Sequence, residues 1–263
     1  MTELTWNSAT EWDSAQYEDG VVHESVANTD HDDDTVVKKG HSAATPYLAS
    51  NLLVYYPLHD DSGSPTDLSG NNNDGTNHGA TPNQAGLLGT TGYSCDGSDD
   101  WIEVPSGILT TSSDFTVACW FKHRNTSQDS AIWSLRGDLY IQWRVNRNGN
   151  GNLDYYDGNN YQRILSPLPE DTWLYGIFTY DDSATQMTAY IDNDQKRQTS
   201  SSAESRDDAT CIGAWNGPNN GGHAPVNVWD YRIYDKVLSS TERTTLFDVV
   251  DTPGTLTTGK KTS

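Results

Sequence analysis

Apolar and polar residues alternate with a period of two between Thr172 and Asp194. From Trp173 to Tyr180, and again from Met187 to Ile191, successive side chains fall into two alternating sets, which is the pattern of β-strands. The sequence Asp-Asp-Ser-Ala-Thr between the two runs has the turn-prone residues of a hairpin loop. Both runs carry aromatic or apolar residues on both faces, so we predict a hairpin of two central strands.

Short apolar runs separated by Gly, Asn, Asp, Ser and Thr recur along most of the remaining chain. We predict further strands in the runs that begin at Leu48, Phe115, Asp138 and Val226. Apolar spacing typical of a helix is confined to a turn or two near Ser239 to Val250. These patterns predict an all-β antiparallel sandwich.

The chain has 37 acidic and 16 basic residues, a formal charge of −21, and a large excess of Asp over Glu. Self-repulsion weakens such a compact state at low salt, and concentrated salt screens it over a few ångströms. We interpret this composition as that of a protein from a halophile; an ordinary acidic extracellular domain is the alternative. Because no basic patch exists to meet phosphates, we expect no nucleic-acid partner.

Three cysteines, Cys95, Cys119 and Cys211, are too few and too widely spaced for a disulfide framework or a zinc site. Each lies in an apolar, strand-like context, so we expect buried free thiols. The opening MTELTWNSAT lacks the positive and apolar regions of a signal peptide, and no long apolar run follows. We therefore expect neither a secretion signal nor membrane insertion.

Three regions differ in composition. Residues 1–47 are polar and acidic with isolated aromatic residues, and they cannot bury a core by themselves. We interpret them as an extended N-terminal arm for assembly and anchoring, with a disordered leader as the alternative. Residues 48–250 form the predicted domain, and residues 251–263 form a polar, flexible tail.

Several phrases of this domain resemble the laminin-G-like, concanavalin A-type jelly-roll family. They are the opening Leu53 to Asp60, the Asp-Leu-Ser-Gly-Asn loop from Asp67 to Gly79, the run Tyr93 to Pro105, the central hairpin, and Val226 to Glu242. Asn193 stands where the family usually has Gly, and it also tolerates positive φ. Trp229 replaces the usual first Asp of the last phrase. The resemblance covers about residues 50 to 250 and implies an antiparallel jelly roll.

Some jelly rolls of this type hydrolyse glycosides, which requires two carboxylates on one face. No Glu-x-Asp-x-Glu or similar cluster occurs, and four of the Glu residues fall in the arm. A Ser/His/Asp arrangement or a metal-hydrolase motif is also missing from the sequence. We therefore expect no catalytic residues and no enzymatic activity.

The resemblance also implies structural calcium. Ca²⁺ takes oxygen ligands from flexible loops, and Asp60, Asp67 and Asn71 lie in loops that resemble those of the family, with Asp230 on the closing strand. These four residues are the predicted calcium ligands. Because an Asp-rich surface places carboxylates in every loop, solvated side chains are the alternative.

A predicted glycan site centres on the strand Asp138 to Val145. Its alternation places Tyr140, Gln142 and Arg144 on one face, opposite an apolar face. An aromatic ring beside an amide and a guanidinium can stack on a sugar and bond its hydroxyls. We add Tyr156 and, from a Gly-rich loop, Trp215 and Asn216. The alternative is that these aromatic residues fill the sandwich.

Together these features predict a non-enzymatic structural or surface protein of a halophilic virus. It would decorate the capsid, form a turret, or belong to a tail fibre or spike on the virion surface. Its lectin-like domain would attach to host surface glycans, while the arm would contact other virion proteins and other copies of the chain in a homo-oligomer. The alternatives are an architectural oligomer without ligand and a secreted carbohydrate-binding adhesin at the cell surface.

Overall fold

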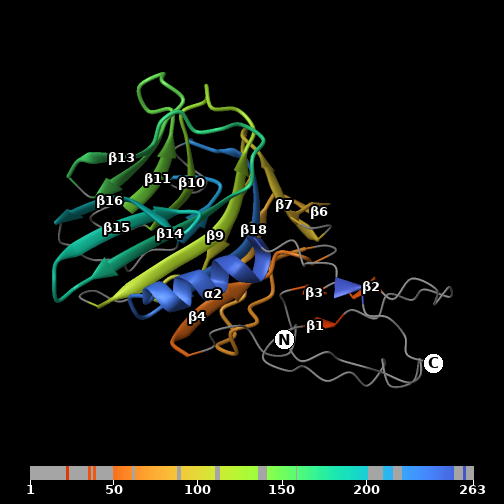
Figure 1. Cartoon of the computed structure of the whole chain (residues 1–263). Coiled ribbons are helices and arrows are strands. Elements are labelled where there is room, and N and C mark those ends of the chain that lie inside the picture. Colours follow the sequence, from red (N-terminus) through yellow and green to blue (C-terminus); the bar gives the residue numbers. More distant parts are fainter. Residues whose placement is uncertain are drawn as a thin grey trace, which may run out of the picture.

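The structure is a computed structural model of the whole chain (Figure 1). It describes residues 50–60, 63–87, 90–109, 113–135, 141–157, 159–200, 210–215 and 221–251, with four two-residue strands outside these ranges. Those strands pair as β1 (Val22–His23) with β3 (Lys38–Lys39), and β2 (Thr35–Val36) with β19 (Thr257–Thr258). The rest of the predicted arm, and most of the predicted tail, lie outside the described residues.

Two antiparallel sheets form the domain, as the alternation predicted. The 7-stranded sheet has the order β13 (Tyr161–Leu165), β12 (Leu153–Asp157), β11 (Ile141–Val145), β10 (Ser130–Leu135), β17 (Thr210–Ile212), β8 (Trp101–Val104) and β5 (Thr76–His78). The 8-stranded sheet has the order β16 (Asp194–Ser200), β15 (Gln186–Ile191), β14 (Leu174–Asp181), β9 (Phe115–His123), β18 (Pro225–Tyr234), β7 (Thr91–Asp96) and β6 (Thr81–Ala85), with β4 (Leu52–Tyr56) also paired to β18. The all-β sandwich is thereby confirmed.

The predicted hairpin forms strands β14 and β15, which lie inside the larger sheet. Tyr180 pairs with Met187 across the turn, and both strands are buried on both faces. Asn193 has a φ of 62° in the turn after β15, so the residue in place of glycine adopts the left-handed conformation. The chain then continues into β16, a polar edge strand that the alternation did not predict.

The core between the sheets is rich in aromatic rings. Trp133 and Trp143 of the smaller sheet stack with ring centroids 5.5 Å apart, and Phe178 of the larger sheet meets Trp133 edge-on at 5.7 Å. Gly176 makes room for this cluster, since a Cβ there would lie 2.4 Å from Cζ3 of Trp143. Close packing of this kind fixes how the sheets face each other.

Helix α2 (Ser240–Asp251) covers the outer face of the larger sheet, near β4, β9 and β14 (Figure 1). Phe247 of the helix stacks on Trp120 and Tyr175 of the sheet. The helix is longer than the turn or two that its apolar spacing predicted. No helix among the described residues is long and apolar enough to cross a membrane.

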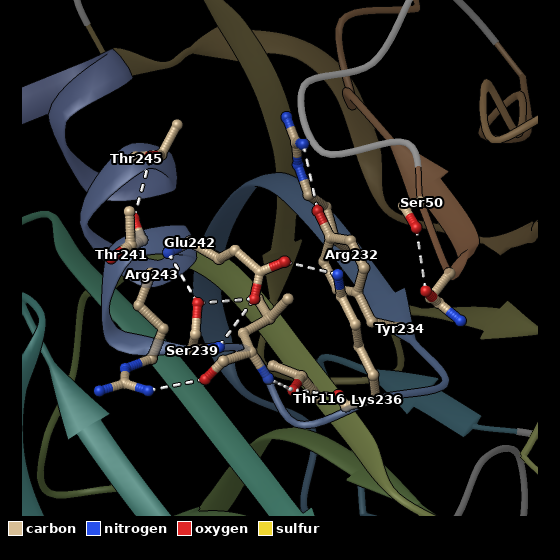
Figure 2. A network of polar contacts seen from close by, with 12 residues as sticks. Ser50, Thr116, Arg232, Tyr234, Lys236, Ser239, Thr241, Glu242, Arg243 and Thr245 are labelled. Atoms are coloured by element: carbon tan, nitrogen blue, oxygen red, sulfur yellow. Dashed lines mark hydrogen bonds and ion pairs between the residues drawn. The ribbon is translucent and has the colours of Figure 1, made fainter.

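A capping box starts this helix (Figure 2). The Ser239 hydroxyl accepts a hydrogen bond from the backbone N–H of Glu242, and the Glu242 carboxylate accepts one from the backbone N–H of Ser239. Lys236 donates to the other carboxylate oxygen. The Lys236 hydrogen bond is the largest of the effects that lower the pKa of Glu242 to about 2.

Cys95, Cys119 and Cys211 are all buried, and none of them forms a disulfide, as predicted. Burial raises the pKa of Cys95 to about 12, so this thiol stays protonated and unreactive. One stretch predicted as a loop contains a strand, because β5 lies between Asp67 and Gly79. Thr76 of β5 pairs with Glu103 of β8. This pairing makes β5 a strand, although its polar sequence does not predict one.

Candidate functional site

A row of polar and aromatic side chains crosses one end of the smaller sheet. Tyr161 of β13 pairs with Tyr156 of β12, and Tyr156 pairs with Gln142 of β11. Residues directly opposite each other in neighbouring strands project from the same face. Trp143 and Tyr155, the next residues along β11 and β12 respectively, project from the other face and are buried in the core. The row therefore lies on the face turned away from the second sheet.

A groove with a volume of about 390 Å³ lies along this row. Its lining combines two arginines, three side-chain amides and three aromatic rings, with no carboxylate among the described residues. The lining side chains are Gln142, Arg144, Arg147, Tyr156, Asn159, Asn160, Tyr161 and Trp215.

Gln142 is the most deeply placed polar group of the lining. It is 7% exposed, and its side-chain amide makes no hydrogen bond with any described residue. An amide has two donors and an acceptor oxygen. The groove therefore offers a ligand an unused set of donors and acceptors.

Arg144 fixes the walls of the groove. Its Nε and Nη2 each donate to one carboxylate oxygen of Asp129 at 2.7 Å, and its Nη1 donates to the Tyr161 hydroxyl at 2.7 Å. Its guanidinium also lies 4.1 Å from the centre of the Trp215 ring. Burial lowers the pKa of Arg144, Asp129 and Tyr161 raise it, and the net shift is upward. Arg144 is therefore charged, and its contacts with Asp129, Tyr161 and Trp215 fix its position in the groove.

Arg147 lies in the turn after β11 and returns over the groove. Its guanidinium is 3.5 Å from the centre of the Tyr161 ring. Asn146 holds this turn with a φ of 58°, and its side-chain oxygen accepts a hydrogen bond from the backbone N–H of Gly151 at 2.8 Å. Arg147 itself is exposed and makes no hydrogen bond or ion pair with a described residue.

The loop between β12 and β13 closes the end of the groove. The carboxylate of Asp157 accepts backbone hydrogen bonds from Asn159 and Asn160, at 3.0 and 2.7 Å. Their side-chain amides make no hydrogen bond within the described chain and line the groove. Hydroxyl groups of a ligand can therefore pair with them without displacing a protein partner.

The structure brings together four of the six residues predicted to bind a glycan, namely Gln142, Arg144, Tyr156 and Trp215. Tyr140 and Asn216 lie outside the described residues. Tyr161 and Arg147 were not predicted. A signal for Tyr161 did exist, because it follows Tyr156 at a spacing short enough for a hairpin, and the two residues pair across β12 and β13.

Two of the predicted calcium ligands, Asp67 and Asn71, hold the loop between β4 and β5 through hydrogen bonds. Asp67 accepts four hydrogen bonds, from the backbone N–H of Tyr55, Ser69 and Asn73 and from the Ser69 hydroxyl. The side-chain nitrogen of Asn71 donates to the Leu52 carbonyl at 2.8 Å. Ca²⁺ at these groups would compete with the hydrogen bonds of this loop.

The other two predicted ligands lie elsewhere. Asp230 is 1% exposed and accepts a hydrogen bond from Nε of Arg232 at 2.8 Å. Asp60 lies near Tyr93, and burial followed by the Asp60 charge raises the pKa of Tyr93 to about 12. Asp230 is therefore part of an internal ion pair. The calcium site as a whole stays a prediction.

A cluster of three aspartates was not predicted as a metal site. The carboxylates of Asp96, Asp99 and Asp100, in the turn between β7 and β8, lie within 4.8 Å of one another. The backbone N–H of Asp96 donates to Asp100 at 3.0 Å, and that of Ser98 donates to Asp96 at 2.7 Å. These bonds also account for the turn without an ion.

The fold and the groove together define a class: an antiparallel β-sandwich with a polar groove, lined by aromatic rings, on the outward face of one sheet. Residues 96–242, more than half of the chain, match the Laminin_G_3 family, described as the concanavalin A-like lectin/glucanases superfamily. The chain belongs to this superfamily, so the resemblance of its motifs is confirmed. The matched range includes every residue that lines the groove.

Solved structures of the same fold come from toxins and a sialidase. The binding domain of paraclostridial mosquitocidal protein 1 matches with a TM-score of 0.60 and 17% identity, over 76% of this chain and 52% of that one. The botulinum neurotoxin serotype D binding domain matches at 0.59 and 15%, over 79% and 52%. The Trypanosoma rangeli sialidase in complex with sialic acid matches at 0.61 and 17%, over 86% and 37%. The chain thus spans about half or less of these proteins, and at such identities they establish the fold alone. No curated protein matches the chain.

Proposed function

We propose that this protein is a non-enzymatic carbohydrate-binding module whose ligand lies in the groove over β11, β12 and β13. The observation that carries the proposal is Gln142, a residue only 7% exposed whose side-chain amide lines the groove and makes no hydrogen bond with a described residue. Sugar hydroxyls both donate and accept hydrogen bonds, so they match an amide in either orientation. The Tyr156 ring, which also lines the groove, supplies apolar surface on which a sugar ring can pack.

The groove favours binding over hydrolysis. Glycoside hydrolysis uses a pair of carboxylates that flank the scissile bond, and no carboxylate is among the described residues that line the groove. Asp129 and Asp157 are not among the lining residues, and their carboxylates are engaged by Arg144 and by backbone N–H groups, respectively.

A direct test replaces Gln142 by Leu, which keeps the volume and removes the amide. We expect the full chain to bind members of a glycan array in molar NaCl, and Gln142→Leu to weaken the affinity for them by about ten- to one-hundredfold. Gln195→Leu is the matched control, because Gln195 is exposed on β16 of the other sheet. Equal binding by Gln142→Leu and the unaltered chain would place the ligand elsewhere.

We further propose that the module works on the surface of a virion from a saline habitat and attaches it to host glycans. The formal charge of −21 and the polar composition of residues 1–47 support this setting. In it, the arm holds the module to other copies and to other virion proteins. Light scattering in molar salt tests the arm by comparing the full chain with a chain that begins at Leu48. A larger assembly formed only by the full chain supports the proposal, whereas two monomers contradict it.

A purely architectural oligomer is the competing function. It would assemble through the same arm but leave the groove empty of ligand. A tight oligomer of the full chain that binds no glycan in molar salt would select it.

A further inference from the structure

Basic side chains line the groove of a strongly acidic chain. The whole chain carries 37 acidic against 16 basic residues, yet two arginines and no carboxylate are among the residues that line the groove. A positively lined groove on a protein that repels anions elsewhere indicates a ligand with a negative group.

Arg144 does not supply the positive charge that a ligand would meet. It donates to both carboxylate oxygens of Asp129, so its charge is balanced, and Asp129 and Tyr161 occupy edges of the guanidinium. Its contribution is to hold the groove in shape.

Arg147 is different from the other arginines of the described chain. Each of the others donates at least one hydrogen bond to the protein: Arg124, Arg144, Arg163, Arg197, Arg232 and Arg243. Arg147 donates none to a described residue, and instead its guanidinium stacks on the Tyr161 ring at 3.5 Å. The stack restricts the guanidinium while its N–H donors remain available.

A stacked guanidinium with unused donors suits a planar or tetrahedral oxyanion. Arginine pairs with a carboxylate through two parallel hydrogen bonds, and stacking reduces the rotational freedom that such a pair would otherwise lose. Lysine could supply the charge but neither the fork nor the stack.

We propose that the groove takes an acidic saccharide, with its carboxylate or sulfate group on Arg147 and its sugar hydroxyls on Gln142. This inference rests on the proposed function and narrows its ligand to one chemical class. Arg147 then selects acidic over neutral sugars, and Gln142 serves both.

The test uses the full chain in 1 M NaCl on an array that carries neutral, uronate-containing, sialylated and sulfated glycans. We expect acidic glycans to dominate the bound set. Arg147→Gln should weaken their binding by about tenfold to a hundredfold and bring it close to that of the neutral glycans. Arg147→Lys should recover only part of the loss. Because Arg147 is exposed and makes no hydrogen bond to the described chain, these changes spare the fold.

Two comparisons make the outcome decisive. Lys196→Gln removes the same charge from exposed β16, so an equal loss in that variant would mean diffuse charge rather than an Arg147 contact and would overturn the inference. Esterified uronates and desulfated glycans then identify which oxyanion is bound. If the chain prefers neutral glycans and Gln142→Leu still weakens their binding, the acidic ligand is overturned. The carbohydrate-binding function would then still hold. Silence of the whole array overturns both.

Discussion

His123 at the end of β9 should make the stability of the protein depend on pH. Its ring is 1% exposed, its Nδ1 accepts a hydrogen bond from the backbone N–H of Asn125 at 3.3 Å, and its Nε2 lies 3.1 Å from the Ser130 hydroxyl. The Ser130 hydroxyl donates onward to the Gln128 carbonyl at 3.2 Å, so it accepts from Nε2. Both ring nitrogens are thus satisfied in the neutral form, and a second proton on Nδ1 would break the bond to Asn125.

Burial is the main cause that lowers the pKa of His123 from 6.5 to about 4; the charge of Glu170 raises it and that of Arg124 lowers it further. The unfolded chain therefore binds a proton near pH 6.5 that the folded chain takes up only near pH 4. The contribution of neutral His123 to stability is fully present above pH 6.5 and is lost as the pH falls from 6.5 to about 4. At 1.36 kcal/mol per pH unit, the loss is about 3 kcal/mol.

Urea unfolding at fixed molar NaCl, from pH 7.5 to pH 4, measures this loss. His123→Gln keeps a donor and an acceptor but cannot titrate, so its free energy of unfolding should fall by about 3 kcal/mol less than that of the unaltered chain. Carboxylates titrate in both proteins and cancel in the difference. His59→Gln, at an exposed position, should behave like the unaltered chain. Parallel curves for the unaltered chain and His123→Gln would refute the reasoning.

Two further predictions concern packing and the buried charges. Gly176→Ala would place a Cβ 2.4 Å from Trp143, and we expect this overpacking to lower the free energy of unfolding by about 1–3 kcal/mol in urea titrations; an unchanged midpoint would mean that the aromatic core yields easily. Asp230→Asn removes the partner charge of Arg232, where both side chains are 1% exposed, and we expect a loss of about 3–5 kcal/mol. The double variant with Arg232→Met should recover part of this loss, and no recovery would show that the two charges act independently.

The strands that could be predicted from the sequence are the buried ones, because burial requires apolar side chains in an alternating pattern. β14 and β15 have apolar side chains on both faces, so alternation and a turn-prone loop were enough to place them. The edge strand β16 reads Asp-Gln-Lys-Arg-Gln-Thr-Ser and is almost wholly exposed. Its extended shape comes from hydrogen bonds to β15, and a polar sequence gives no period to detect.

Some residues of the groove could likewise be predicted from the sequence, and others could not. Gln142 and Arg144 follow from alternation on one strand, because their neighbours Trp143 and Val145 must point inward. Arg147 depends on a turn in which Asn146 adopts a left-handed conformation, and no pattern along the strand indicates that the side chain then returns over Tyr161. For Asp230 the sequence suggested a role that the structure does not favour. An isolated acidic residue suggests a metal ligand, but β18 has an irregular register between Trp229 and Arg232, and Asp230 forms an ion pair with Arg232 there.

The charge of the chain also decides how the groove can recognise an anion. At low salt, where the Debye length is about 10 Å at 0.1 M, a net charge of −21 opposes the approach of an acidic ligand from every side. In 1 M salt the Debye length falls to about 3 Å, which screens this long-range repulsion, whereas the contact proposed at Arg147 acts within that distance. Selection of an acidic saccharide by this protein therefore has to come from direct contact rather than long-range steering. The selection proposed for Arg147 therefore requires one stacked guanidinium in direct contact with the acidic group. It does not require a surrounding basic patch.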